Sequence, residues 1–194
     1  QLQRLMEVPA ALNKLKRMKA VLLGGGPIPQ QLIERAFNSG LPIHTSYGST
    51  EMSSQVTTTR PSDSVDRLKT AGRVLPYRDI SVDNDDEILV RGETLFMGYL
   101  ENQQVVPRRD PNGWFHTGDL GLMDGEGYLT ILGRKDNQFI SGGENIQPEE
   151  VERLLLQFAE VSEAMVVPVD DPEFGKRPVA FLKIQDYKIQ EDKS

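Results

Sequence analysis

Residues 45–51 have the sequence TSYGSTE, and the interpretation of the whole chain depends on this segment. Its small polar residues predict a turn that carries one aromatic ring, several hydroxyls and one carboxylate. Such a ring can stack on a nucleobase, hydroxyls can donate to phosphate, and a carboxylate can bind the magnesium ion that accompanies nucleotides. Taken alone, the segment favours an ordinary polar turn after a strand, because short motifs often match by chance.

The segment ends a predicted strand–helix–strand unit. Residues 20–23 are a short apolar run followed by glycines, which indicates a buried strand and a tight turn. Apolar residues at helical spacing between Pro29 and Gly40 predict a helix, and residues 41–45 form the second strand. We expect the two strands to be parallel and their connection right-handed, so that both glycine-rich segments lie at carboxyl ends of strands, where open α/β sheets bind ligands.

The glycines at positions 24–26 do not have the G-x-G-x-x-G spacing of a dinucleotide site, so no Rossmann-type site is inferred. Two uses stay open for them. One is a tight turn before a helix, and the other is close approach of the backbone to a flat ligand, since glycine lacks a Cβ. Further upstream, residues 3–18 have helical spacing that Pro9 divides into two short helices.

The second half of the chain changes character twice. Residues 57–69 are polar and predict a loop at a subdomain boundary. Beyond them, short segments separated by turn residues predict an antiparallel β part, with strands near 73–76, 79–82, 87–92 and 127–133. From Pro148 the spacing of Val151, Leu154, Leu155 and Phe158 predicts a helix with one buried face, and strands follow at 164–169 and 178–184.

Composition limits the classes of function. The 194 residues are 38% hydrophobic and 26% charged, as in a globular protein, and no apolar run approaches the roughly 20 residues of a membrane helix. The net charge of −7 argues against a nucleic-acid surface, which needs clustered Lys and Arg. The absence of cysteine excludes a disulfide scaffold and fits a cytoplasmic protein. We therefore predict no nucleic-acid or membrane partner, while a homo-oligomer stays open.

Several further segments occur in a fixed order around the opening one. They are LLGGGP at 22–27, GWFHTGD at 113–119, GRKD at 133–136 and SGGEN at 141–145. Together they resemble the adenylate-forming superfamily of acyl-CoA synthetases, luciferases and peptide-synthetase adenylation domains. Within it, residues 136–152 and 173–180 look most like the ligases that join o-succinylbenzoate to coenzyme A in menaquinone biosynthesis. Ligases for another aryl or fatty acid are the alternative within this class.

The resemblance implies a partial adenylate-forming fold. Residues 1–135 would be the distal part of a large N-terminal adenylating domain, with an α/β part at 1–70 and a mainly antiparallel, β-barrel-like part at 71–135. Residues 136–194 would be a hinge and an incomplete small α+β C-terminal domain. Two family elements have no counterpart in this sequence, a phosphate-gripping loop before residue 20 and a lysine-bearing segment after residue 194. We therefore expect a fragment of a longer enzyme, inactive or weakly active in adenylation by itself.

The resemblance also implies a reaction and its cofactors. A carboxylic acid attacks the α-phosphate of ATP to give an acyl-adenylate and pyrophosphate, and coenzyme A then displaces AMP to give a thioester. Thr50 and Glu51 would be catalytic, with Thr50 on the α-phosphate and Glu51 on Mg²⁺. Tyr47 would stack on adenine and Asp119 would accept hydrogen bonds from both ribose hydroxyls. The remaining nucleotide-binding residues would be Gly25, Gly26, Pro27, Ser46, Gly48 and Arg134.

Each of these residues also has a purely structural interpretation. Tyr47 could be a core ring, Glu51 an acid at a helix start, Asp119 a turn residue and Arg134 a surface arginine. His116 is interpreted as a structural part of its motif. A non-catalytic nucleotide-binding module using Tyr47 and Asp119 is the hypothesis from a different class.

The same resemblance assigns roles in the second half-reaction. Asp136 would be the hinge about which the small domain rotates between the two steps. Ser141, Gly142, Gly143 and Glu144 would then line the tunnel for the pantetheine of coenzyme A, since glycine lets backbone pass close to a thin chain. An ordinary hairpin turn is the structural alternative for these four residues.

Overall fold

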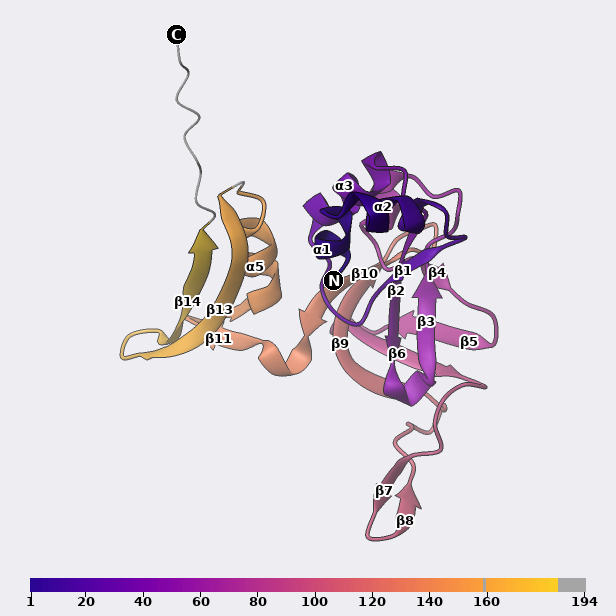
Figure 1. Ribbon diagram of the computed structural model, residues 1–194. Helices are drawn as coiled ribbons and strands as arrows, with labels where there is room; N and C mark the ends of the chain where they lie inside the picture. The colour runs from indigo at the N-terminus through magenta and orange to yellow at the C-terminus, as the bar shows by residue number, and fades with distance from the viewer. Residues whose placement is uncertain (159, 185–194) are drawn as a thin grey trace. The chain divides into compact units, whose positions relative to one another are not determined.

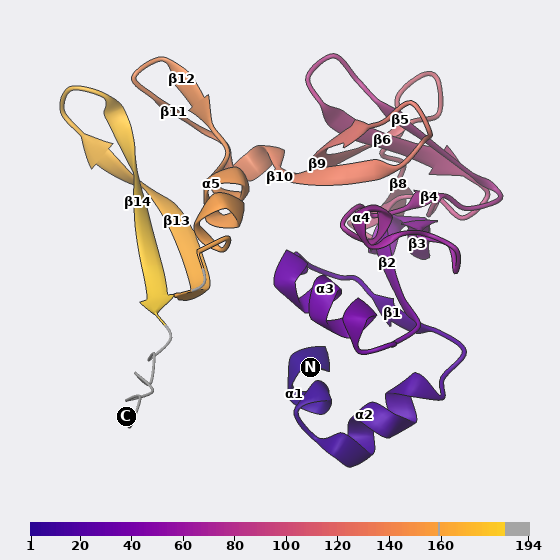
Figure 2. The same ribbon diagram turned by 90° about the horizontal axis from the view of Figure 1, so that it is seen from above.

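The computed structural model of the chain describes residues 1–158 and 160–184. The chain divides into two compact units, Gln1–Ile131 and Leu132–Ser194, and each is described by itself (Figures 1 and 2). Within the part that the structure describes, no helix is long and apolar enough to span a membrane. The predicted domain boundary at residues 135 and 136 stays a prediction.

The first unit opens with helices that cover one face of a small sheet. Helices α1 (Leu2–Met6) and α2 (Pro9–Lys16) are separate, and Pro9 occupies the first turn of α2, as its fixed backbone angle predicts. Strand β1 (Val21–Leu23), helix α3 (Gln30–Asn38) and strand β2 (Ile43–Ser49) follow. The strands pair in parallel from Val21↔Ile43 to Leu23↔Thr45, which confirms the predicted strand–helix–strand unit.

Helix α3 buries only part of its predicted apolar face. Ile33 and Ala36 are 2% and 0% exposed and pack with Leu41 and Ile43, whereas Phe37 is 42% exposed. The two buried positions are three residues apart and face the sheet. Phe37 lies in the last turn of the helix, which ends before Gly40 with its φ of +73°.

The prediction of a turn at residues 45–51 was wrong for most of the segment. Strand β2 continues through Ser49, and its second half pairs antiparallel with β3 (Ser54–Thr58) across a bulge between Tyr47 and Gly48. The turn comes later, as the 3₁₀ helix η1 (Thr50–Met52). The reason is the alternation of side chains: positions 43, 45 and 47 are buried and 44 and 46 are not, which is the period of a strand despite the polar composition.

The predicted loop at residues 57–69 was also partly wrong. Thr57 and Thr58 belong to β3, and residues 65–68 form helix α4 (Val65–Leu68), before β4 (Arg73–Val74). Thr57 is 0% exposed, and its hydroxyl donates to the carbonyl of Ala71 at 2.6 Å. A β-branched threonine that satisfies its hydroxyl inside the protein fits a buried strand, although it looks polar in the sequence.

A second, antiparallel sheet lies mainly in the first unit, and its strand β10 crosses the boundary after Ile131. Its strand order is β10-β9-β6-β5, and β9 is strongly curved in Figure 1. The strands are β5 (Arg78–Val82), β6 (Glu87–Gly92), β9 (Phe115–Met123) and β10 (Leu129–Arg134), with a separate hairpin of β7 (Tyr99–Glu101) and β8 (Gln104–Val106). The short antiparallel strands predicted near 79–82, 87–92 and 127–133 are confirmed. Strand β9 and the hairpin were not predicted.

The second unit is a small α+β arrangement. It contains η2 (Lys135–Asn137), the hairpin of β11 (Phe139–Ser141) and β12 (Glu144–Ile146), α5 (Pro148–Leu155), β13 (Val161–Asp171) and β14 (Gly175–Ile184). Strands β13 and β14 are antiparallel, which confirms both predicted strands. The predicted buried face of α5 needs correction, because Leu154 and Phe158 are 55% and 61% exposed and Phe158 lies beyond the helix.

Candidate nucleotide site

The two glycine-rich segments meet in one cleft of the first unit, with a volume of about 770 Å³. Gly24 and Gly25 reach it from the end of β1, while residues of β2, η1 and β3 form the other side. Of the predicted nucleotide-binding residues, Gly25, Ser46, Gly48 and Thr50 line the cleft. The other predicted nucleotide-binding residues are not among those that line this cleft: Gly26, Pro27, Tyr47, Asp119 and Arg134.

A side chain would be crowded at two of these positions, by a side-chain hydroxyl at Gly24 and by backbone atoms at Gly48. A Cβ on Gly24 would lie 2.6 Å from the Ser46 hydroxyl oxygen, and one on Gly48 would lie 2.2 Å from the carbonyl oxygen of Ser54. Gly25 differs, because nothing lies within 4 Å of its missing Cβ while its φ is +82°. The open space beside Gly25 agrees with both earlier interpretations, a tight turn and a backbone exposed to a ligand.

Ser49 adds a polar group that the sequence alone did not single out. Its hydroxyl is buried, and within residues 1–158 and 160–184 it has no hydrogen-bond partner. Buried hydroxyls are normally paired, so a polar ligand in the cleft that Ser49 lines would satisfy it. The signal available in the sequence was its place between Gly48 and Thr50.

Tyr47 and Asp119 lie 72 positions apart and form a direct hydrogen bond. The phenol of Tyr47 donates to Oδ2 of Asp119 at 2.6 Å. The Tyr47 side chain is only 9% exposed and packs in the apolar cluster around Met52 and Val56. The structural interpretation of Tyr47 as a core ring therefore describes part of its role, while its predicted stacking on adenine stays a prediction.

Glu51 is held at the edge of the hairpin region. Its Oε1 accepts a hydrogen bond from the Tyr99 phenol at 2.7 Å, and its backbone carbonyl accepts from the amide of Phe96 at 2.7 Å. It directly follows Thr50, whose side chain is exposed at the cleft. Mg²⁺ binds well to one carboxylate supplemented by phosphate oxygens and water, so Glu51, with the hydroxyls of Thr50 and Ser49 nearby in sequence, fits such an ion.

The remaining predicted residues lie in or next to the second unit. Arg134 ends β10, and its Nη2 lies 3.1 Å from Oδ2 of Asp136 in η2. Residues 141–144 form the tight β11–β12 turn, in which Gly142 and Gly143 have φ of +58° and +90°. The hairpin interpretation of this turn is therefore confirmed, and its proposed contact with coenzyme A stays a prediction.

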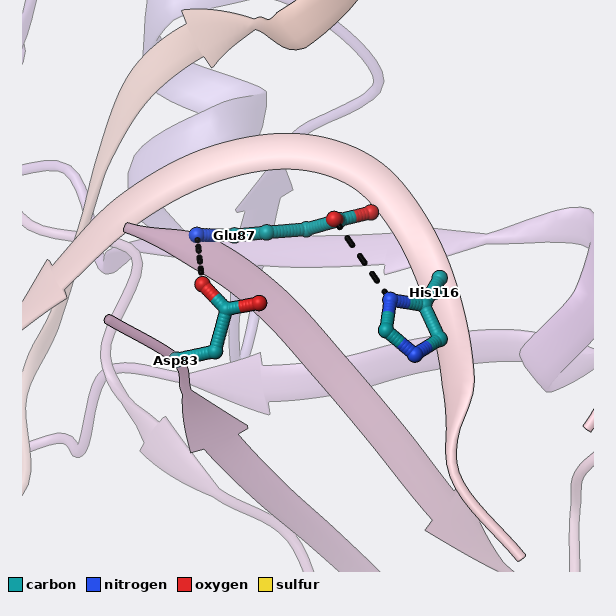
Figure 3. A group of neighbouring side chains, drawn as sticks. All are labelled: Asp83, Glu87 and His116. Atoms are coloured by element: carbon teal, nitrogen blue, oxygen red, sulfur yellow. Dashed lines mark hydrogen bonds and ion pairs between the residues drawn. The ribbon is translucent and has the colours of Figure 1, made fainter. Parts of the chain in front are cut away.

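A separate group of titratable side chains joins β6 to β9. Asp83, Glu87 and His116 place one ligand atom each within 4.8 Å of one another (Figure 3). Glu87 is only 7% exposed, and its Oε2 lies 3.5 Å from Nδ1 of His116. These residue types can bind a divalent cation, but Glu87 also accepts a hydrogen bond from the amide of Gly118, the residue before Asp119.

The chain is similar to proteins of known activity. Residues 1–100 match the family of AMP-binding enzymes. The 2-succinylbenzoate–CoA ligase of Bacillus pumilus is 38% identical, over 98% of this chain and 40% of that ligase. The o-succinylbenzoate CoA synthetase of Bacillus subtilis with the intermediate OSB-AMP is 37% identical with a TM-score of 0.79, over 95% of this chain and 40% of that one.

A further structure of the Bacillus subtilis synthetase holds ATP and a magnesium ion, and it is 36% identical with a TM-score of 0.74, over 91% of this chain and 40% of that one. The chain thus spans about 40% of the length of the relatives it matches. These similarities confirm the expected fold class, a partial adenylate-forming fold, and the chain belongs to the family of AMP-binding enzymes.

Proposed function

We propose that this chain carries the adenosine-binding part of an AMP-forming acid–CoA ligase, with 2-succinylbenzoate as the acid. The observation that carries the proposal is the 38% identity to the Bacillus pumilus ligase over 98% of the chain, second unit included. The alternative acids of this class, aryl or fatty, are outcomes of the test below. We further propose a role in menaquinone biosynthesis in the cytoplasm, in line with the absence of cysteine.

In the first half-reaction the acid's carboxylate attacks the α-phosphorus of ATP, and the bond to pyrophosphate breaks. The protein has to position the reactants and stabilise the charge on the phosphoryl oxygens. Thr50 would donate to the α-phosphate, while Glu51 would hold Mg²⁺, which neutralises phosphate charge when bound. Asp119 would accept from both ribose hydroxyls, supported by the Tyr47 hydrogen bond at 2.6 Å.

In the second half-reaction the thiolate of coenzyme A attacks the acyl carbon, and AMP leaves with the bonding electrons. We propose that the second unit serves this step, with Asp136 as the hinge and residues 141–144 beside the pantetheine. The positive φ of Gly142 and Gly143 supports the latter role, because backbone without side chains leaves room for a thin ligand.

Calorimetric titration of the 194-residue chain with AMP and Mg²⁺ tests the nucleotide site. We expect saturable binding that Asp119→Ala weakens at least about tenfold, as loss of charge-assisted hydrogen bonds would. Asp79→Ala is the matched control, since Asp79 pairs with Arg91 on the same sheet at 2.9 Å. This substitution should not change the affinity for AMP. Equal binding by the Asp119 and Asp79 variants would contradict the assignment.

The acid is tested by competition on the same chain. A non-hydrolysable 2-succinylbenzoyl adenylate should bind more tightly than AMP, and more tightly than the benzoyl or decanoyl adenylate analogue. A preference for either of the latter two would support a ligase for another aryl or fatty acid. If AMP binds and no acyl analogue binds better than AMP, a non-catalytic nucleotide-binding module is the better description.

A further inference from the structure

Strand β9 leaves the regular ladder where it carries Asp119. Glu87 of β6 pairs with Leu120, and Leu89 pairs with His116, so a step of two residues on β6 matches a step of four on β9. Residues 117–119 of β9 therefore stand opposite the single residue Ile88. A bulge of this kind loses ladder hydrogen bonds, so other groups have to fix the backbone that presents Asp119.

Side chains replace those missing hydrogen bonds. Oε1 of Glu87 accepts from the amide of Gly118 at 3.0 Å, where the backbone has a φ of +69°. The hydroxyl of Thr117 donates to the carbonyl of Ile88 at 2.7 Å and accepts from the amide of Asp119 at 3.0 Å. The amides of Gly118 and Asp119 are thus each held by a side chain, from Glu87 on β6 and from Thr117 in the bulge.

The Glu87 carboxylate is itself fixed on its second side. It is 7% exposed, its Oε2 faces Nδ1 of His116 at 3.5 Å, and its own amide donates to Oδ1 of Asp83 at 2.9 Å (Figure 3). A buried carboxylate is stable only when hydrogen-bonded, and here the Gly118 amide supplies the hydrogen bond to Oε1. Glu87 can therefore hold the Gly118 amide in a defined position.

We propose that Glu87 is a positioning residue for nucleotide binding: by holding the Gly118 amide it sets the bulge at which Asp119 meets the Tyr47 phenol. The inference rests on the proposed function, in which Asp119 binds the ribose. Positioning is favoured over a cation site because one oxygen of each carboxylate already accepts from backbone amides: Oε1 of Glu87 from Gly118 at 3.0 Å, and Oδ1 of Asp83 from both Asp85 and Glu87 at 2.9 Å.

The test compares Glu87→Ala with Glu87→Gln by AMP titration. The glutamine oxygen can still accept from the Gly118 amide, so we expect it to stay within about threefold of the native affinity, while alanine loses about tenfold or more. Glu93→Ala is the matched control, because Glu93 is an exposed glutamate just after the same strand. Equal losses in the alanine and glutamine variants, or none in either, would overturn the proposal.

A double-mutant cycle separates positioning from a general structural effect. If Glu87 acts through Asp119, the Glu87→Ala/Asp119→Ala protein binds AMP no more weakly than Asp119→Ala alone. Additive losses would show that Glu87 acts independently and would overturn the proposal. Should Glu87→Ala fail to fold, Glu87→Leu replaces it in the same cycle, because leucine fills the buried position and likewise cannot accept from the Gly118 amide.

Amide hydrogen exchange, followed by NMR, tests without nucleotide whether Glu87 holds the Gly118 amide. Glu87→Ala should speed exchange at Gly118 at least tenfold more than at the β5–β6 amides, and Glu87→Gln should not. If the native chain binds no AMP but this pattern appears, the proposed function fails, while the hold of Glu87 on the Gly118 backbone is still shown. Protection of Gly118 by Zn²⁺ or Mn²⁺ alone, lost in Asp83→Ala, would show a cation site instead and overturn the proposal.

Discussion

Tyr47 combines two separable parts, a ring packed in the core and a hydroxyl that donates to Asp119. Sequence reasoning recognised both residues but assigned them separate ligand contacts, because nothing in one sequence shows which residues 72 positions apart are adjacent. The same limit applies to the hydrogen bond between Tyr99 and Glu51 and to the one between Gly118 and Glu87, because the two residues of each pair are distant in the chain. Residue identity suggested the chemistry, whereas the pairings became visible only in three dimensions.

Tyr47→Phe tests the hydroxyl while keeping the ring. It removes the donor that lies 2.6 Å from Oδ2 of Asp119, so we expect the free energy of unfolding to fall by about 1–3 kcal/mol and AMP affinity to fall with it. Urea titration and calorimetry measure the two effects. Tyr47→Leu, which also removes the ring, is the comparison: unchanged AMP affinity in Tyr47→Phe with a loss in Tyr47→Leu would favour stacking as the main role.

Gly48→Ala tests the close packing of β2 on β3. The new Cβ would lie 2.2 Å from the Ser54 carbonyl oxygen and 2.7 Å from Cα of Gln55, both backbone atoms that cannot rotate away. We expect a loss of about 2–3 kcal/mol in the free energy of unfolding. Gly125→Ala, with nothing within 4 Å of the Cβ, should change it by less than about 0.5 kcal/mol. Equal stability of both variants in urea would contradict this packing.

The turn between β9 and β10 shows how an element is fixed by one side chain. Asp124 accepts from the amides of Tyr128 and Glu126, each at 2.9 Å, and pairs with the guanidinium of Arg67 in α4. The Tyr128 amide in particular, together with these other donors, lowers the pKa of Asp124 below its ordinary value. The turn and α4 are thereby tied to each other through a carboxylate that must stay ionised.

Stability should therefore depend on pH through Asp124. Because its pKa is lower in the folded chain, its contribution is fully present above the unfolded value of about 4 and is lost as pH falls through the folded value. Asp124→Asn keeps an acceptor oxygen but does not titrate, so its melting temperature should fall less than that of the native chain between about pH 5 and pH 2. An equal fall in melting temperature for the variant and the native chain over that pH range would refute the assignment of this pH dependence to Asp124.

Elements with clear periodicity could be predicted from the sequence, and those with polar composition could not. The break at Pro9, the β1–α3–β2 unit and the last two strands follow from proline geometry and from apolar spacing. Strand β3 and the end of β2 were missed because buried threonines and a tyrosine satisfy their hydroxyls internally, a compensation that composition does not show. Strand β9 was missed because its bulge interrupts the alternation of side chains.

At the scale of the whole molecule, the division into two compact units predicts separate responses to mutation. In the second unit, Oε1 of Glu152 in α5 accepts from the amide of Val166 in β13 at 2.8 Å, and Val166 is 5% exposed. Glu152→Ala leaves that amide unpaired, which should cost about 1–3 kcal/mol. Hydrogen exchange should rise in α5 and β13 and stay unchanged in residues 1–131.

Glu150→Ala is the control for this experiment, because Glu150 is exposed on the same helix. It should leave exchange in both units unchanged. Faster exchange throughout residues 1–131 in Glu152→Ala would mean that the two units open together and that the division has no energetic counterpart.

The span of 72 residues between Tyr47 and Asp119 has a consequence for the order of folding events. Closing so long a loop costs more entropy than forming the β2–β3 or β5–β6 pairs, whose partners are near in sequence. We therefore expect this hydrogen bond to form after the rate-limiting barrier. Tyr47→Phe should then speed unfolding in stopped-flow experiments and leave the refolding rate nearly unchanged, so that the site is the last part of the first unit to assemble.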